Sequence, residues 1–276
     1  MFIYGLLICA LLVFVFQNHI IYNCGGGEWL MESQRHPPLA FGLPNPRAIR
    51  DNGELPAGTI TAFERPGSDT VIYYFHGNGR RMEHDYWRIG QLYGVCNCSI
   101  YAIEYPHCLE TKLFGHSMHD YRMWLSRLLG VHLQAGKRNY LLGASLGTAF
   151  VISAYPYTWS IMSATISGVI LENPFTTVAA VISPSYATHV EAFLLNSWDN
   201  SGVLSLFDTK VPVLFLTSEH DEITPPHMST TLHDMWSAHS KKTRVLLKGS
   251  LHGHAASHPD YLPAVVEFLK EKNAEA

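Results

Sequence analysis

The stretch that decides the fold of this chain is Gly143-Ala144-Ser145-Leu146-Gly147. It follows the apolar run at residues 140–142 and precedes a helix-like run at residues 148–152. A serine with glycines two residues away on both sides, between a strand and a helix, is typical of a sharp turn that exposes the serine hydroxyl. The glycines let the strand and the helix pass close to each other because they lack a Cβ atom. We therefore expect Ser145 to be a nucleophile on such a turn.

Outside this turn, strand-like and helix-like segments alternate. The predicted strands are residues 59–63, 70–75, 99–103, 138–142, 168–171, 211–217 and 243–247. The predicted helices are residues 82–93, 118–133, 145–155, 227–240 and 259–272. This alternation predicts an α/β fold with a mostly parallel sheet, of about eight strands, and helices on both of its faces. Residues 174–209 interrupt the alternation and are predicted to form a small helical cap beside the site.

The chain is predicted to begin with a membrane anchor. Residues 2–22 are nearly all apolar, which is long enough for one helix to cross a bilayer. A cleaved signal peptide is the alternative, but no Lys or Arg precedes the apolar run. The first basic residue, Arg35, follows the run and favours a cytoplasmic position for the body of the protein. We expect residues 1–22 to be a single-pass anchor in the endoplasmic reticulum or another endomembrane, 23–57 a linker, and 58–276 one catalytic domain.

Composition excludes several classes of function. The formal net charge is -4 and only 15% of residues are charged, with no run of Lys and Arg, which argues against nucleic acid as a partner. The 16 histidines do not fall at metal-ligand spacing. The five cysteines are odd in number, so no disulfide framework is predicted and they are interpreted as buried small thiols. No metal and no cofactor is expected.

A serine hydroxyl needs a base to take its proton, and the base needs an acid to orient it. The acid candidate is Asp221, in the loop after the predicted strand 211–217. The carboxyl end of a parallel strand is where the site of an open α/β sheet lies. Glu219 and Glu222 are close alternatives in the same loop.

The base candidate is His252, which follows the predicted strand 243–247 and the turn after it. His254 and His258 are near enough in the sequence to compete for the same role. A histidine near the end of the chain, downstream of a serine turn and an acidic loop, is more typical of a base than a lone histidine after a strand.

A negatively charged tetrahedral intermediate requires preorganised N–H donors. The backbone N–H of Leu146, directly after the predicted nucleophile, is one candidate. The second is expected from the loop after an early strand, where residues 76–79 read His-Gly-Asn-Gly. The Asn78 N–H is the first choice there and the Gly79 N–H is the second.

With these residues in place, the chain resembles membrane-anchored α/β-hydrolase-domain proteins of the lysophospholipid and monoacylglycerol lipase group. The resemblance covers about residues 58–272 and rests on residues 76–79, 142–148, 170–176 (Ile-Leu-Glu-Asn-Pro-Phe-Thr) and 221–225, and on His252 with Pro259. That group usually has Glu-Ser-Pro-Phe-Thr in the third of these pieces. It also has Asp-Tyr-Arg-Gly-Phe-Gly where this chain reads Glu-Tyr-Pro-His-Cys-Leu from Glu104. Because that loop borders the active-site mouth, the substrate preference is expected to differ.

The resemblance implies the α/β-hydrolase fold, with Ser145 as nucleophile, Asp221 as acid and His252 as base. It also implies hydrolysis of carboxylic esters of lipids, with a lysophospholipid or a monoacylglycerol as the substrate and a membrane as the partner surface. A protein depalmitoylase would use the same residues on a thioester, and a peptidase would use them on an acyl-aminoacyl substrate. The alternative from another class is a catalytically silent interaction module.

Overall fold

The computed structural model describes residues 38–50, 59–109, 117–162, 166–185, 187–191, 194, 197–206 and 210–270. The predicted anchor at residues 1–22 and most of the predicted linker lie outside this part of the chain. Among the described residues, no helix has both the length and the apolar character that crossing a bilayer requires.

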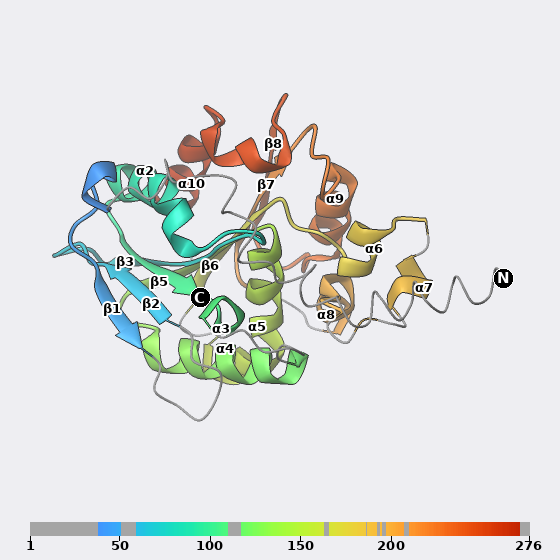
Figure 1. Ribbon diagram of the computed structural model, residues 1–276, viewed down its shortest axis with the longest axis horizontal. Coiled ribbons are helices and arrows are strands. Elements are labelled where there is room, and N and C mark those ends of the chain that lie inside the picture. The colour runs from blue at the N-terminus through green and yellow to red at the C-terminus, as the bar shows by residue number, and fades with distance from the viewer. Residues whose placement is uncertain are drawn as a thin grey trace.

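Eight strands of the described chain form one sheet in the order β1-β2-β4-β3-β5-β6-β7-β8 (Figure 1). Strand β2 pairs antiparallel with both β1 and β4, and all the other pairs are parallel. The strands are β1 Arg47–Arg50, β2 Thr59–Phe63, β3 Thr70–Phe75, β4 Ser99–Glu104, β5 Arg138–Ala144, β6 Ile166–Glu172, β7 Val213–Ser218 and β8 Lys242–Leu247.

The central strands are buried along their whole length because helices cover both faces of the sheet. Every residue of β3, β4 and β7 is buried, as expected of parallel strands that contact helices on both sides. The helical segments are η3 Pro38–Phe41, η4 Met82–Asp85, α2 Tyr86–Cys96, α3 Pro106–Leu109, α4 Met118–His132, α5 Leu146–Met162, α6 Val178–Ile182, α7 Ala187–Glu191, α8 Asn200–Leu206, α9 Pro226–Met235, η5 His252–Ser257 and α10 Tyr261–Lys270.

Two hydrophobic cores lie on the two faces of the sheet. One core contains residues of α4, α5, α8 and α9, among them Trp124, Phe150 and Leu232. The other contains residues of α2 and α10, among them Ile89 and Val265. In Figure 1, α2 and α10 accordingly lie on one side of the strands and α4 and α5 on the other.

An aromatic group joins the end of β4 to helix α5. The ring of Tyr105 stacks on Phe150 with centroids 4.2 Å apart and an interplanar angle of 13°. Trp124 of α4 and Trp198 also contact Phe150, at centroid distances of 6.2 and 4.5 Å. Because α5 begins directly after Ser145, this group positions the helix that carries the serine turn.

All seven predicted strands are present, and the structure adds β1, which the sequence analysis does not predict. β1 is a four-residue edge strand with arginines at both ends, and its Ile49 is only partly buried against the core. Its position comes from backbone pairing with β2, which leaves little periodic signal in side chains. The predicted helix 227–240 ends at Met235, because Trp236 turns to extended backbone.

The cysteines differ from their interpretation at one position. Cys96 and Cys98 are free, as expected, but Cys108 is disulfide-bonded. An odd number of cysteines argues against a complete framework of bridges without excluding a single one, and for that reason the interpretation of Cys108 as a thiol is wrong.

Candidate active site

Ser145 lies on a strained turn between β5 and α5. Its φ angle is +50°, in the left-handed region that a non-glycine residue rarely adopts. A Cβ atom on Gly143 would lie 2.5 Å from the carbonyl oxygen of Gly147, and one on Gly147 would overlap the carbonyl oxygen of Phe75. The two glycines of the motif are therefore required by close backbone approach, and the half-buried serine stands at the carboxyl end of the central strand.

The imidazole of His252 contacts Ser145. Its Nε2 lies 2.9 Å from Ser145 Oγ. Its Nδ1 lies 2.9 and 2.8 Å from the two carboxylate oxygens of Asp221. Because a carboxylate only accepts, the proton is on Nδ1 and Nε2 is left to accept from the serine hydroxyl. Three side chains that are far apart in the sequence thus form one continuous set of hydrogen bonds.

The neighbouring candidates in the two loops do not reach the serine. Glu219 accepts the backbone N–H of Gly249 at 2.8 Å, and Glu222 accepts that of His252 at 3.1 Å. His254 is exposed, and the Nε2 of His258 lies 3.1 Å from a backbone carbonyl oxygen, that of Lys248. The two glutamates brace the loop that carries His252, and the hydrogen bond from the His252 N–H helps to hold the pKa of Glu222 below its ordinary value.

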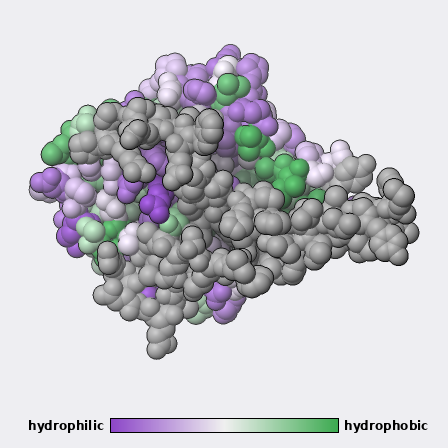
Figure 2. Space-filling view, in the orientation of Figure 1, coloured by the Kyte–Doolittle hydropathy of each residue, from purple (hydrophilic) through white to green (hydrophobic). Residues whose placement is uncertain are grey.

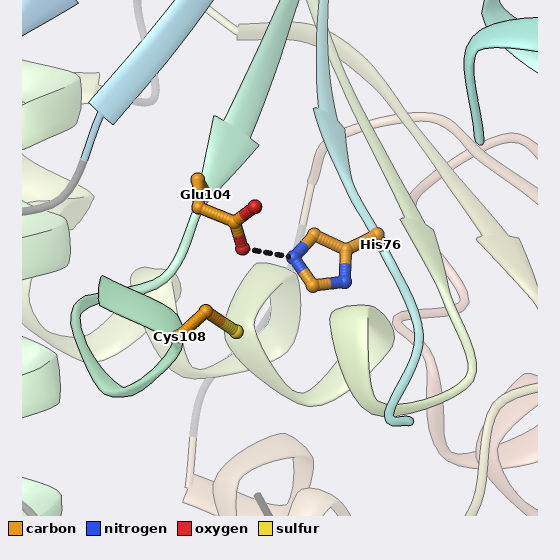
Figure 3. Close-up of side chains that lie close together, drawn as sticks. All are labelled: His76, Glu104 and Cys108. Atoms are coloured by element: carbon orange, nitrogen blue, oxygen red, sulfur yellow. Dashed lines mark hydrogen bonds and ion pairs between the residues drawn. The ribbon is translucent and has the colours of Figure 1, made fainter. Parts of the chain in front are cut away.

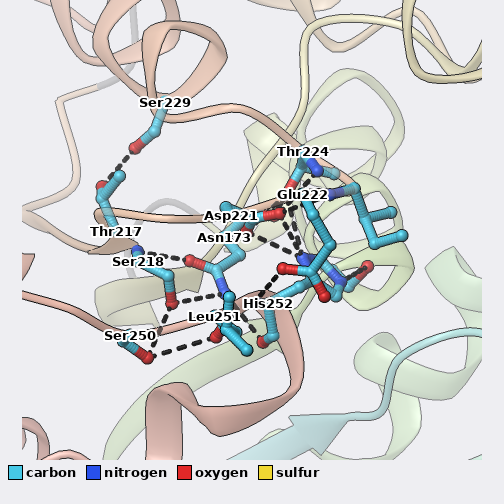
Figure 4. Close-up of polar contacts among 12 residues, drawn as sticks. Asn173, Thr217, Ser218, Asp221, Glu222, Thr224, Ser229, Ser250, Leu251 and His252 are labelled. Atoms are coloured by element: carbon cyan, nitrogen blue, oxygen red, sulfur yellow. Dashed lines mark hydrogen bonds and ion pairs between the residues drawn. The ribbon is translucent and has the colours of Figure 1, made fainter.

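Asp221 is almost fully buried, and protein donors surround its carboxylate. Its Oδ1 accepts the backbone N–H groups of Ile223 and Thr224 at 2.9 and 2.7 Å. The hydroxyl of Thr224 lies 3.0 Å from Asp221 Oδ2 and 3.2 Å from His252 Nδ1. These donors stabilise the ionised carboxylate and fix it in line with the imidazole (Figure 4).

Asn173 connects the acid and base loops, and the sequence analysis does not single it out. It follows β6 with a φ of +48°. Its side-chain amide donates to Ser218 Oγ and to the carbonyl of His252, both at 3.1 Å. Its Oδ1 accepts from the Ser218 N–H at 2.8 Å, and its backbone carbonyl oxygen lies 3.2 Å from the Thr224 hydroxyl oxygen. In the sequence, Asn173 appears only as a member of segment 170–176, one of the segments on which the family resemblance rests.

A buried charged cluster lies below the serine turn. The Ser145 N–H donates to the carbonyl of Glu172 at 2.8 Å. The carboxylate of Glu172 pairs with Arg88 at 2.9 Å and accepts from Tyr261 at 2.8 Å. Burial raises the pKa of Tyr261 well above its ordinary value, so its hydroxyl stays a donor. This cluster anchors the end of β6, against which the serine turn is hydrogen-bonded.

The two predicted N–H donors lie on segments next to Ser145. Leu146 is the first residue of α5, and the first N–H groups of a helix have no partner within it. On the other side, a Cβ atom built on Gly77 would lie 3.5 Å from the Cβ of Ser145, so the loop carrying Asn78 runs beside the serine. The Ser145 N–H itself is donated to the carbonyl of Glu172.

No protein-family model matches the chain. It is 25% identical to the protein bem46 of Schizosaccharomyces pombe over 237 residues. This alignment covers 81% of this chain and 75% of that protein. It is 29% identical to an uncharacterised membrane protein of Saccharomyces cerevisiae, YNL320W, over 151 residues. This alignment covers 54% of this chain and 51% of that relative.

Solved structures resemble the chain along most of its length. The naproxen esterase of Bacillus subtilis superposes with a TM-score of 0.60 at 14% identity, over 84% of this chain and 94% of that one. Est1E of Butyrivibrio proteoclasticus superposes with a TM-score of 0.56 at 15% identity, over 81% and 96%. Together with the strand order, these likenesses show that the chain has the α/β-hydrolase fold.

Proposed function

We propose that this chain is a membrane-anchored serine hydrolase that cleaves carboxylic esters of lipids. The observation that carries the proposal is the continuous set of hydrogen bonds from Ser145 Oγ through His252 to Asp221. Support also comes from its fold, which it shares with the naproxen esterase of Bacillus subtilis. A strained, half-buried serine with a base and a buried acid in line is the arrangement that activates a hydroxyl for acyl transfer.

In the proposed acylation step, Ser145 Oγ attacks the ester carbonyl carbon while His252 Nε2 takes the hydroxyl proton. The carbonyl oxygen becomes an oxyanion that the N–H groups of Leu146 and Asn78 stabilise. The N-terminus of α5 adds a favourable dipole at the same place. The imidazolium then gives its proton to the leaving alcohol oxygen as the bond between that oxygen and the acyl carbon breaks, which leaves an acyl-serine.

Deacylation repeats these steps with water. His252 Nε2 removes a proton from a water molecule, whose oxygen attacks the acyl carbon. The second tetrahedral intermediate collapses, Ser145 Oγ leaves with the proton from His252, and the carboxylic acid departs. Asp221 keeps the imidazole in one orientation and stabilises its positive charge in both steps.

Exposed apolar side chains next to the site support a lipid substrate. Ile223 lies two residues after Asp221, and Leu251 directly precedes His252; they are 48% and 44% exposed. Ile182 on α6 is 41% exposed. Figure 2 shows apolar surface gathered over the region of α6 and α9. Apolar groups at the rim of a site favour acyl chains over polar substrates.

The anchoring part of the proposal rests on the apolar residues 2–22 of the sequence. An anchor would hold the site close to the bilayer, where a poorly soluble ester is concentrated. The Saccharomyces cerevisiae relative is also described as a membrane protein.

The full chain in detergent or vesicles tests the proposal directly. The wild-type protein should react with a fluorophosphonate probe and hydrolyse p-nitrophenyl butyrate. Ser145→Ala should lose both, with kcat falling by roughly 10⁶-fold because nothing replaces the nucleophile. Circular dichroism of the variant should match the wild type. Labelling that survives Ser145→Ala would reject the mechanism.

A substrate panel then tests the lipid assignment. Lysophosphatidylcholine, a monoacylglycerol and an S-palmitoylated peptide are compared at equal concentration in the same vesicles. Faster release of fatty acid from either ester supports the proposal, and a preference for the thioester would assign depalmitoylation instead. Labelling without turnover of any of the three would contradict the lipid substrate while leaving the serine mechanism in place.

A further inference from the structure

A buried ion pair joins Glu104 to His76, which lies two residues before Asn78 in the chain (Figure 3). His76 is the first residue after β3 and is 1% exposed, and Glu104 is the last residue of β4. The His76 Nε2 lies 3.0 Å from Glu104 Oε1. The second carboxylate oxygen accepts the Met82 N–H at 3.0 Å. The catalytic steps described above use neither side chain, although Gly77 and Asn78 follow His76 directly.

The other nitrogen of the same ring holds the next peptide group. His76 Nδ1 lies 2.8 Å from the carbonyl oxygen of Gly77. A carbonyl oxygen only accepts, so Nδ1 must carry a proton. Glu104 contacts Nε2 on the opposite side of the ring and so prevents the ring from turning over. The carbonyl of His76 itself accepts the hydroxyl of Tyr105 at 2.7 Å, which also fixes the preceding peptide.

The position of the Gly77 carbonyl decides where the next N–H points. No cis peptide bond occurs in the described residues, and in a trans peptide the C=O and the N–H point in opposite directions. With the Gly77 oxygen drawn to the buried imidazole, the Asn78 N–H points away from it. Gly77 itself packs on the serine turn, where its added Cβ atom would lie 3.5 Å from the Ala144 oxygen as well as from Ser145 Cβ.

We propose that His76, clamped by Glu104, is a positioning residue that orients the Gly77–Asn78 peptide so that the Asn78 N–H faces the oxyanion formed beside Ser145. The inference rests on the proposed function and adds to it the residues that set one half of the oxyanion site. The inference also gives Glu104 the role of holding the His76 ring. The proteins that this chain resembles usually have Asp at this position.

A positioning role fits this cluster better than a metal site. His76, Glu104 and Cys108 have ligand atoms within 4.8 Å of one another, but Cys108 is disulfide-bonded and offers no thiolate. Both oxygens of Glu104 already accept hydrogen bonds from the protein. Burial alone would lower the pKa of His76, but the hydrogen bond and negative charge of Glu104 outweigh it and raise that pKa.

Two amide substitutions at His76 separate its two contacts. The amide nitrogen of Asn lies as many bonds from the backbone as Nδ1 of His, and that of Gln as many as Nε2. His76→Asn therefore keeps the donor to the Gly77 carbonyl and loses the contact with Glu104. His76→Gln keeps the contact with Glu104 and loses the donor to the carbonyl. We expect His76→Asn to be the more active of the two variants and His76→Gln to be the more stable.

The assay uses p-nitrophenyl butyrate and the full chain, with kcat normalised to the fraction of sites that a fluorophosphonate labels at completion. His76→Gln should lower kcat by up to about 10²-fold, as for loss of one oxyanion donor, with KM changed little. His76→Asn should retain most of the wild-type kcat while melting at a lower temperature than His76→Gln, because it leaves Glu104 buried without its partner.

The outcomes separate this inference from the proposed function. If Ser145→Ala abolishes labelling but His76→Gln turns over at the wild-type rate, the positioning role is wrong and the hydrolase stands. If both His76 variants lose kcat in proportion to their loss of melting temperature, the pair has a structural role only and the inference is overturned. Labelling that persists in Ser145→Ala would instead reject the proposed function itself.

Discussion

The two sides of Ser145 are built differently, although each presents a histidine paired with a carboxylate. On one side, His252 and Asp221 lie on the loops after β8 and β7, and the His252 side chain is 17% exposed. On the other side, His76 and Glu104 are at the ends of β3 and β4, and the His76 side chain is 1% exposed. Neutral donors, such as the Thr224 hydroxyl, surround the first pair, whereas the second is packed between Tyr105 and the strands.

The difference follows from what each histidine has to do. In the proposed mechanism, His252 gains and loses a proton in every turnover, so its Nε2 must meet the substrate and water. His76 only has to keep a proton on Nδ1 and so orient the Gly77–Asn78 peptide group. Full burial and a charged partner serve that purpose because they hold the ring in one orientation, with Nδ1 facing the Gly77 carbonyl. In the proposed mechanism, the same two residue types thus perform proton transfer in one place and support the backbone in the other.

The largest effect that this comparison predicts is on the pair formed by His252 and Asp221. His252→Ala and Asp221→Asn should each lower kcat by on the order of 10⁴-fold, the first by removing the base and the second by no longer holding the correct tautomer. Steady-state hydrolysis of p-nitrophenyl butyrate measures both. The matched controls are Glu219→Gln and Glu222→Gln, whose carboxylates accept backbone N–H groups and do not contact the His252 ring. They should change kcat by less than about tenfold. A glutamate variant as inactive as Asp221→Asn would reassign the acid.

A smaller effect is expected at the link between the acid and base loops. Asn173→Asp keeps the size of the side chain but replaces the amide donor with acceptors that face the carbonyl of His252. We expect kcat to fall by about tenfold as the base loop shifts, and the free energy of unfolding to fall by about 1–3 kcal/mol from the lost buried hydrogen bonds. Kinetics and urea denaturation measure the two effects. An unchanged kcat would show that Ser218 and Thr224 hold the loops without Asn173.

The smallest effect concerns how the stability contributed by the His76–Glu104 pair depends on pH. The raised pKa of His76 means that this pair contributes its full stability below about pH 6.5, the ordinary value, and that the contribution disappears as pH rises through the raised value. Glu104 from β4, Asp85 from η4 and Tyr105 after β4 are the titratable groups that face the ring. The stability difference between wild type and His76→Gln should therefore narrow from pH 6 to pH 9. A difference that widens with pH would contradict the ion pair.

Sequence reasoning reached the parts of the site that local chemistry dictates. The serine and the two glycines of the turn lie within five consecutive residues, so the motif alone predicts the turn, although Gly147 also approaches the carbonyl oxygen of Phe75 on a distant strand. Sequence placed Asp221 and His252 at strand ends, which the sheet then brings together. The sequence names Asp221 as the acid and leaves Glu219 and Glu222 as alternatives. Only the three-dimensional structure shows which of these three side chains contacts His252.

Other features depend on contacts that leave no local pattern. His76 and Glu104 are 28 residues apart and become neighbours only because β3 and β4 pair in parallel. Asn173 acts through partners on two further loops, and nothing in its own segment shows them. Strand β1 owes its place to backbone pairing with β2. In each case tertiary structure decides, and the sequence carries only residue types that are compatible with it.

The aromatic group beside helix α5 has a practical consequence. Trp124 and Trp198 both contact Phe150, whose ring stacks on Tyr105, and the Tyr105 hydroxyl binds the carbonyl of His76. These contacts connect two fluorescent tryptophan side chains to the backbone of the segment that begins at His76. We expect tryptophan emission to change when this backbone segment moves, and stopped-flow fluorescence can follow that change without an added label.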